Sequence, residues 1–195
     1  MNIFDFFAYN TLKGLGVKYL KMNLRSVKTI GVFVTFILCF LTHFLYTFFP
    51  NFLTSLFFPV NESIWEHVKM MVSTILIWEV IEYFLLKNFS INHNNFLFSL
   101  FITIIVSIPI FLIIYYPIYK CIGSVFLINI ICLFIAIYFS YVIGYQVMNK
   151  GDLNLGIFGL VGIILLYIIF GYFTYFPPKN ELFLNPVDNS YGISN

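Results

Sequence analysis

Charged side chains are scarce in this sequence. Asp, Glu, Lys and Arg make up 9% of its 195 residues, against roughly a quarter in an ordinary soluble domain. Hydrophobic residues make up 61%, and a soluble fold of this length needs more polar surface than that to cover its core. The composition excludes an ordinary soluble domain. It predicts one membrane domain, since no hydrophilic stretch is long enough to fold alone.

Several familiar signatures are also missing. The three cysteines, Cys39, Cys121 and Cys132, show no CxxC or Cys/His spacing, which argues against a disulfide framework. There is no HExxH motif, and no small-residue cleavage site follows the first apolar run, so we expect no removable signal peptide. The net charge is +2 without a basic stripe, which excludes nucleic acid as a partner. The abundance of Phe, Ile, Asn and Lys is typical of an AT-rich bacterial genome.

Long apolar runs dominate what is present, each near the roughly 20 residues that a helix needs to cross hydrocarbon. Runs of this length exclude barrel strands. The sequence therefore predicts an all-α, polytopic integral membrane protein with about five transmembrane helices. These are expected at about 30–49, 64–86, 96–115, 123–147 and 155–175. Residues 50–61, broken by two prolines, are expected in the interface or as a re-entrant segment.

Residues 1–27 are predicted to form a basic, amphipathic segment on the membrane surface, ahead of a transmembrane domain at 28–176 and a tail at 177–195. Residues Met1 to Thr29 hold five of the ten Lys and Arg residues. With the N-terminus in the cytoplasm, seven basic residues lie inside and three outside, as the positive-inside rule favours. Five spans in the cell membrane then place the C-terminal tail outside.

The densest polar cluster runs from Asn61 to Lys69, at the start of the second span. Asn61 is expected to cap this helix. Glu62 and Glu66 then lie on one stripe of the helix, and His67 points roughly 140° away from Glu62.

His43, near the outer end of the first span, lies at a similar depth to His67, roughly 9 Å into the membrane at 1.5 Å per residue. Two imidazoles with a carboxylate are a ligand set that suits zinc. We therefore predict a candidate metal site formed by His43, Glu66 and His67. Glu62 and Glu66 are candidate catalytic carboxylates, with Glu62 as the general base. A capped, charged helix end with Trp65 as an interfacial anchor explains the same residues, so both interpretations stay open.

Two further carboxylates, Glu79 and Glu82, lie 13 to 20 residues beyond Glu66 and Glu62, which is roughly 20–30 Å along a helix. They belong to the opposite membrane side. Glu82, close to Lys87, is interpreted as an interfacial carboxylate, with a proton path between the two ends as the alternative.

The last span and the tail carry their own patterns. Glycines at 156, 159, 162 and 171 are expected to let the last helix approach its neighbours closely. Prolines and interleaved apolar residues in the tail predict an ordered segment folded over the outer face, where it would cover the Asn61 to Lys69 cluster. A disordered terminus is the alternative.

From Lys28 to Ile193 the chain resembles a family of small bacterial membrane proteins described only as a domain of unknown function, number 6512. The resemblance is carried by His43 with Tyr46, by the run Pro59 to Lys69, by Glu82-Tyr-Phe, and by three tail motifs, Phe176-Pro-Pro, Asn185-Pro-Val and Tyr191-Gly-Ile. It implies that the outer cluster and the tail belong together, but no activity. Asn185 stands where the family favours an acidic residue.

Three functional classes remain open at this stage. The first is a non-enzymatic membrane protein with a polar site at the outer mouth of the first two helices. The second is an intramembrane metal-dependent hydrolase acting on lipid or lipid-linked substrates, with zinc as its expected cofactor. The third is a small transporter, which would need polar residues through the full membrane depth. The lipid bilayer is the expected partner in each case.

Overall fold

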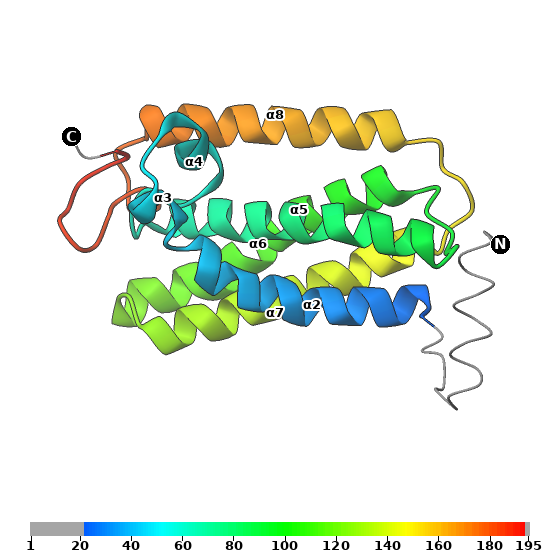
Figure 1. Cartoon of the computed structure of the whole chain (residues 1–195). Coiled ribbons are helices and arrows are strands. Elements are labelled where there is room, and N and C mark those ends of the chain that lie inside the picture. Colours follow the sequence, from blue (N-terminus) through cyan, green and yellow to red (C-terminus); the bar gives the residue numbers. More distant parts are fainter. Residues whose placement is uncertain (1–21, 194–195) are drawn as a thin grey trace.

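The computed structural model describes residues 22–193, which form a bundle of long helices with short connecting segments (Figure 1). No strand occurs within this range, and the only extended pairing is an isolated bridge between Leu184 and Tyr191. The predicted surface segment at 1–27 lies outside the described residues except for its last six. The helices are α2 Leu24–Thr42, α3 Leu45–Phe48, α4 Phe52–Phe57, α5 Ile64–Asn88, α6 Phe96–Ile122, α7 Phe126–Met148 and α8 Gly156–Tyr175.

Four segments are long and apolar enough to cross a membrane: Leu24–Phe48, which joins α2 and α3, together with α6, α7 and α8. The fifth predicted span is α5, which has 25 residues but is more polar. Four of its charged side chains, Glu66, Lys69, Glu79 and Glu82, are buried against the other helices. A charged helix is tolerated in a membrane when its charges face the bundle interior. The all-helical membrane fold is confirmed, with four to five spanning helices.

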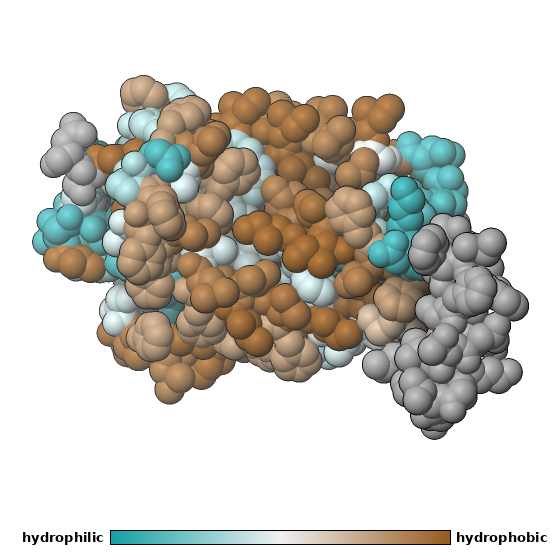
Figure 2. Space-filling view, viewed as in Figure 1, coloured by the Kyte–Doolittle hydropathy of each residue, from teal (hydrophilic) through white to brown (hydrophobic). Residues whose placement is uncertain are grey.

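The surface is divided as a membrane requires. Apolar side chains cover the middle of the visible face, and polar residues gather toward the two ends of the bundle (Figure 2). On α8 the exposed side chains include Ile157, Phe158, Ile164 and Ile168. Exposed residues of this kind match a surrounding of lipid.

The first span begins at Leu24, not near residue 30 as hydropathy predicted. Asn23 caps it, because its side chain accepts a hydrogen bond from the Ser26 amide at 2.9 Å. The helix therefore contains Lys28, whose side chain is only 3% exposed. This shift brings a lysine counted as a surface charge into the bundle.

Close helix packing at α8 depends on glycine, as predicted. A Cβ at Gly159 would lie 2.5 Å from the backbone carbonyl oxygen of Leu97 on α6, and one at Gly162 would meet the ring of Phe101 at 2.4 Å. Gly156, by contrast, would meet nothing nearer than 4.0 Å. The first two glycines thus set the distance between α6 and α8.

The described part of the C-terminal tail, residues 177–193, is folded over the start of α5. The Trp65 amide donates to the Leu182 carbonyl at 2.9 Å, and the Asn61 side chain donates to the Gly192 carbonyl at 2.8 Å. The Trp65 ring packs against Phe183 with centroids 5.0 Å apart. Trp65 of α5 therefore packs against α8 and the tail.

Candidate metal centre

The chain forms a turn at residues 61–63 before α5 begins. Ser63, not Asn61, is the N-cap, since its hydroxyl accepts a hydrogen bond from the Glu66 amide at 3.3 Å. Asn61 holds the preceding turn by accepting from the Ser63 amide at 2.9 Å. Glu62 therefore lies outside the helix. The predicted angle of roughly 140° between Glu62 and His67 assumed that both residues were helical, so it does not apply.

Three side chains from two segments converge at this end of the bundle. His43 is the C-cap of α2, Glu62 belongs to the turn before α5, and His67 lies in the first turn of α5. Glu62 Oε2 is 3.4 Å from His43 Nε2 and 3.5 Å from His67 Nε2. One ligand atom from each residue lies within 4.8 Å of the others.

His67 is oriented by the backbone of its own helix start. Its Nδ1 lies 2.9 Å from the Ser63 carbonyl oxygen, and a carbonyl can only accept, so Nδ1 carries the proton. In the neutral ring Nε2 is then the unprotonated nitrogen, and it faces Glu62 and His43. Metal-binding histidines are commonly oriented through the second ring nitrogen in this way.

The donor set suits zinc or a similar transition metal. Zinc binds imidazole nitrogen at about 2.0–2.1 Å and carboxylate oxygen at about 2.0–2.2 Å in tetrahedral geometry, which makes neighbouring ligand atoms about 3.3–3.5 Å apart. Both distances from Glu62 Oε2 to the two imidazoles match that separation. Three protein ligands would leave one position for water or substrate.

The same contacts act on the carboxylate itself. A hydrogen bond from His43 lowers the pKa of Glu62, and the nearby His67 acts in the same direction, against the opposing effect of burial. Glu62 is 45% exposed and the two histidines are 24% and 11% exposed. The group is therefore accessible to solutes at this end of the bundle, and Glu62 is available as an anionic ligand.

Glu66 lies outside this group. Its Oε2 accepts a hydrogen bond from the Val60 amide at 3.0 Å and pairs with Lys69 Nζ at 2.6 Å. Its Oε1 accepts from Thr174 Oγ1 at 3.1 Å. Lys69 in turn donates to Thr174 and to the Ser55 carbonyl. Both charged groups are fully engaged in joining α4, α5 and α8.

The structure thus brings together three of the four predicted site residues and separates the fourth. His43, Glu62 and His67 meet, whereas Glu66 serves a neighbouring ion pair. Asn185 lies within the tail and donates to Asp188 at 2.7 Å.

A comparison with family models gives a match to the family described as "Family of unknown function (DUF6512)", over residues 17–193. The chain belongs to this family. The match starts at residue 17, earlier than the resemblance at Lys28 indicated, so part of the expected N-terminal extension is family sequence. Searches of curated proteins and of solved structures gave no match.

A second ionisable cluster lies toward the other end of the bundle, and sequence reasoning did not find it. Lys28 Nζ lies 2.8 Å from Glu79 Oε1 and 2.6 Å from Glu82 Oε1. Glu82 is fully buried, and its ion-pair partner is Lys28 of α2. The sequence did contain a signal for this cluster, namely two glutamates three residues apart in an apolar helix. Such carboxylates need a buried partner, which here is Lys28.

Proposed function

We propose that this protein is a multi-pass membrane protein that binds a divalent transition-metal ion, zinc in the first instance, through His43, Glu62 and His67. The observation that carries the proposal is the convergence of these three donor atoms, with His67 fixed by the Ser63 carbonyl so that Nε2 is available. A helix end that merely needed capping would require neither imidazole.

Charge distribution supports an outer location for this site. The basic residues near the N-terminus favour a cytoplasmic N-terminus, and the site lies at the opposite end of α2 from that N-terminal sequence. The C-terminal tail lies at the same end as the site (Figure 1). In this orientation the metal ion is taken from the outside.

The coordination pattern favours hydrolysis over a purely structural role. Structural zinc sites are usually closed by four protein ligands, whereas catalytic sites keep a position for water. A divalent metal held by His43, Glu62 and His67 would supply Lewis acidity for ester or phosphoester cleavage by water. The predicted catalytic role of Glu66 is not favoured, because the Val60 amide, Lys69 and Thr174 occupy its oxygens.

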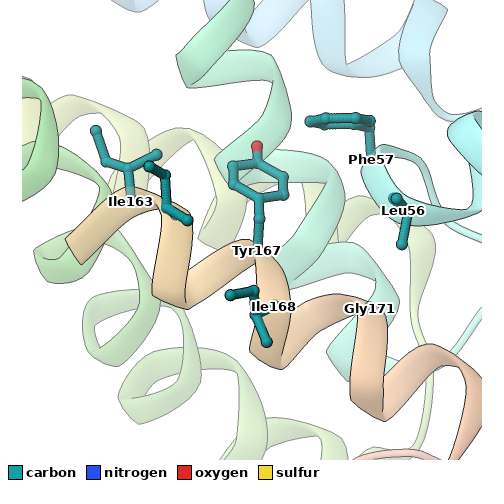
Figure 3. Close-up of a pocket in the computed structure, with 7 residues that line it drawn as sticks. Leu56, Phe57, Ile163, Tyr167, Ile168 and Gly171 are labelled. Carbon is teal, nitrogen blue, oxygen red and sulfur yellow. The ribbon is translucent and has the colours of Figure 1, made fainter. Parts of the chain in front are cut away.

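An apolar groove supports a lipid or lipid-linked substrate. It has a volume of about 450 Å³ and lies between α4 and α8. Figure 3 shows Leu56 and Phe57 of α4 beside Tyr167 and Gly171 of α8, and the rings of Phe57 and Tyr167 are 4.9 Å apart. Because α4 belongs to the end that carries the site, the groove would hold an acyl chain while the headgroup remains at the surface.

The test is the metal content of the detergent-purified protein by elemental mass spectrometry, after incubation with zinc and removal of the excess. We expect near-stoichiometric zinc in the unaltered chain and loss in Glu62→Gln and His67→Ala. The matched control is His93→Ala, because His93 is the third histidine of the chain and bonds the Ile91 carbonyl away from the site. Glu66→Ala distinguishes the ligand set expected from the sequence, which includes Glu66, from the set in the structure, which has Glu62 in its place. Only the second set predicts that the Glu66→Ala variant still binds zinc.

Zinc bound equally by the Glu62→Gln, His67→Ala and unaltered proteins would overturn the proposal. If zinc binds as expected, hydrolysis of fluorescent ester and phosphoester lipids in mixed micelles tests the reaction class. Stoichiometric zinc without turnover of any lipid class would leave the metal site standing and refute the hydrolase.

A further inference from the structure

Three ionisable side chains meet inside the bundle and carry unequal charge. Lys28 of α2 contributes one positive charge, and Glu79 and Glu82 of α5 contribute two carboxylates. The side chains of the two glutamates are 0% exposed and that of Lys28 is 3% exposed. If both carboxylates were ionised, the cluster would hold a net negative charge surrounded by apolar helices.

Such a charge is unfavourable where water cannot solvate it. Two carboxylates that share one site seldom ionise together, because each raises the cost of the other's charge. A single lysine compensates only one of them. The cluster therefore needs one more positive charge, and a proton is the smallest that fits between buried side chains.

The hydrogen bonds distinguish the two glutamates. Glu82 Oε2 accepts from the indole Nε1 of Trp78 at 3.1 Å, and Glu82 Oε1 lies in ion-pair contact with Lys28. Glu79 Oε1 accepts from Lys28, but Glu79 Oε2 is buried and has no hydrogen-bond partner within residues 22–193. Glu82 Oε1 also lacks a hydrogen bond in this range, but it lies 2.6 Å from Lys28 Nζ. Glu79 Oε2 is therefore the one carboxylate oxygen of the pair with neither a hydrogen-bond partner nor an ion-pair partner among the described residues, and it is the oxygen best placed to carry a proton.

Other ionisable groups near the pair in residues 22–193 do not supply the missing charge. Arg25, which lines the same cavity as Lys28, is exposed and forms no ion pair with either glutamate in this range. Within the described range, α7 contributes Tyr141, whose ring lies 5.5 Å from Lys28 Nζ and whose hydroxyl bonds Thr35 at 2.8 Å. Cys39 of α2 is the other titratable group near Tyr141. Neither a phenol nor a thiol carries a positive charge in any protonation state.

A cavity adjoins the cluster at Lys28, although neither glutamate lines it. It has a volume of about 560 Å³ and lies between α2 and α7, with Lys28 and Tyr141 in its wall. Arg25, Tyr145 and Gln146 also line it, near the start of α2 and the end of α7. A proton that enters this cavity would meet the cluster first at Lys28, which contacts both glutamates.

We propose that Lys28, Glu79 and Glu82 form an intramembrane proton-binding site that takes up and releases about one proton per chain through the cavity between α2 and α7. In this reaction the proton adds to a carboxylate oxygen of Glu79 and gives the neutral acid; no other bond changes. This site is independent of the metal centre, which belongs to the other end of α5. It gives the protein a second chemistry, the reversible binding of protons within the membrane.

Infrared spectroscopy of the full chain in detergent tests the proposal, because the carbonyl band of a protonated carboxyl group is separate from that of a carboxylate. We expect a buried-acid band near neutral pH that disappears as the pH rises and is absent in Glu79→Gln. Two controls should retain it: Glu181→Gln, an exposed carboxylate, and Glu66→Gln, a buried carboxylate that is already fully paired.

Folding of the variants provides a second measurement. Glu79→Gln leaves Lys28 paired with Glu82 alone, so it should unfold at the same temperature as the unaltered protein or higher. Lys28→Met leaves two carboxylates without a cation, so its acid band should persist to higher pH. No acid band in the folded protein between about pH 5 and 8, or a band that survives Glu79→Gln, would overturn the proposal. A band removed by sodium chloride at constant pH would show a metal cation in place of the proton and would also overturn it.

Discussion

Replacing Glu66 by alanine removes the only carboxylate within contact of Lys69 in the described part of the chain. Lys69 is 0% exposed, so the ammonium group would remain buried after the change. It keeps two neutral acceptors, Thr174 Oγ1 at 2.7 Å and the Ser55 carbonyl at 2.8 Å. The Val60 amide loses its acceptor at the same time. The variant thus combines an uncompensated charge with an unsatisfied donor.

The expected cost is about 3–5 kcal/mol of unfolding free energy, the range found when one partner of a buried ion pair is removed. A purely surface role for Glu66, as in a capped helix end, would cost below about 1 kcal/mol. The double variant Glu66→Leu/Lys69→Met removes both charges. It should recover most of the loss, because apolar residues often replace a buried ion pair without net cost.

Unfolding in mixed detergent micelles gives these free energies, and Trp65 next to the pair provides a fluorescence signal. We expect Glu66→Ala to unfold at lower denaturant concentration than the unaltered protein and the double variant to unfold near it. Zinc binding by the folded fraction of both variants should be retained.

A loss of unfolding free energy below about 1 kcal/mol for Glu66→Ala, together with loss of zinc, would refute the assignment of Glu66 to the ion pair with Lys69. Glu66 would then be a metal ligand, as the sequence alone predicted. Equal destabilisation in the single and double variants would show that packing volume, not charge, determines the effect.

Three other perturbations follow from the packing and the tail. Gly159→Ala should destabilise the protein by about 1–3 kcal/mol, measured by thermal unfolding, because the added methyl group would lie 2.5 Å from a backbone carbonyl of α6; an unchanged midpoint would contradict the close packing. Asn61→Ala should speed proteolysis of the tail, since it removes the bond to the Gly192 carbonyl; unchanged cleavage would mean that other contacts hold the tail. The hydrogen bond from Lys120 lowers the pKa of Glu181 below its usual 4.5, so this contact stabilises the tail above that pH and is lost as the pH falls through the lowered pKa. Cleavage rates measured against pH, with Lys120→Gln as the variant that lacks the step, test this.

Hydropathy placed most helix starts, because membrane spans are recognised by length and composition, but the third span ends at Ile122 and not near residue 115. The predicted starts of the last four spans agree with the structure within three residues, as at α5 and α6. The first span was placed too late because Lys28 and Arg25 interrupt its hydropathy. Its true start at Leu24 is set locally by the Asn23 cap, whereas the burial of Lys28 within the span depends on a tertiary contact, its pairing with two glutamates on α5, which no local pattern contains.

The metal centre was predicted in part for a similar reason. Depth along the helices correctly placed His43 and His67 at one level. The carboxylate was misassigned because both Asn61 and Ser63 are good N-caps, and the choice between them decides whether Glu62 lies on the helix or in the turn. The tail contact from Asn61 to Gly192 selects Ser63. That contact joins residues 131 positions apart.

The order of the helices along the chain also bears on how this protein enters the membrane. During synthesis α5 emerges before Thr174, which is 108 residues beyond Glu66, so the polar network at its outer end is incomplete at insertion. Lys28, by contrast, belongs to α2 and is already present when Glu79 and Glu82 appear. Insertion of α5 therefore relies first on the ion pairs with Lys28 of α2. The polar contacts at the other end of α5 form only after α8 and the tail have been synthesised. Changes at Lys28 should then reduce the amount of inserted protein even where the finished fold would tolerate them.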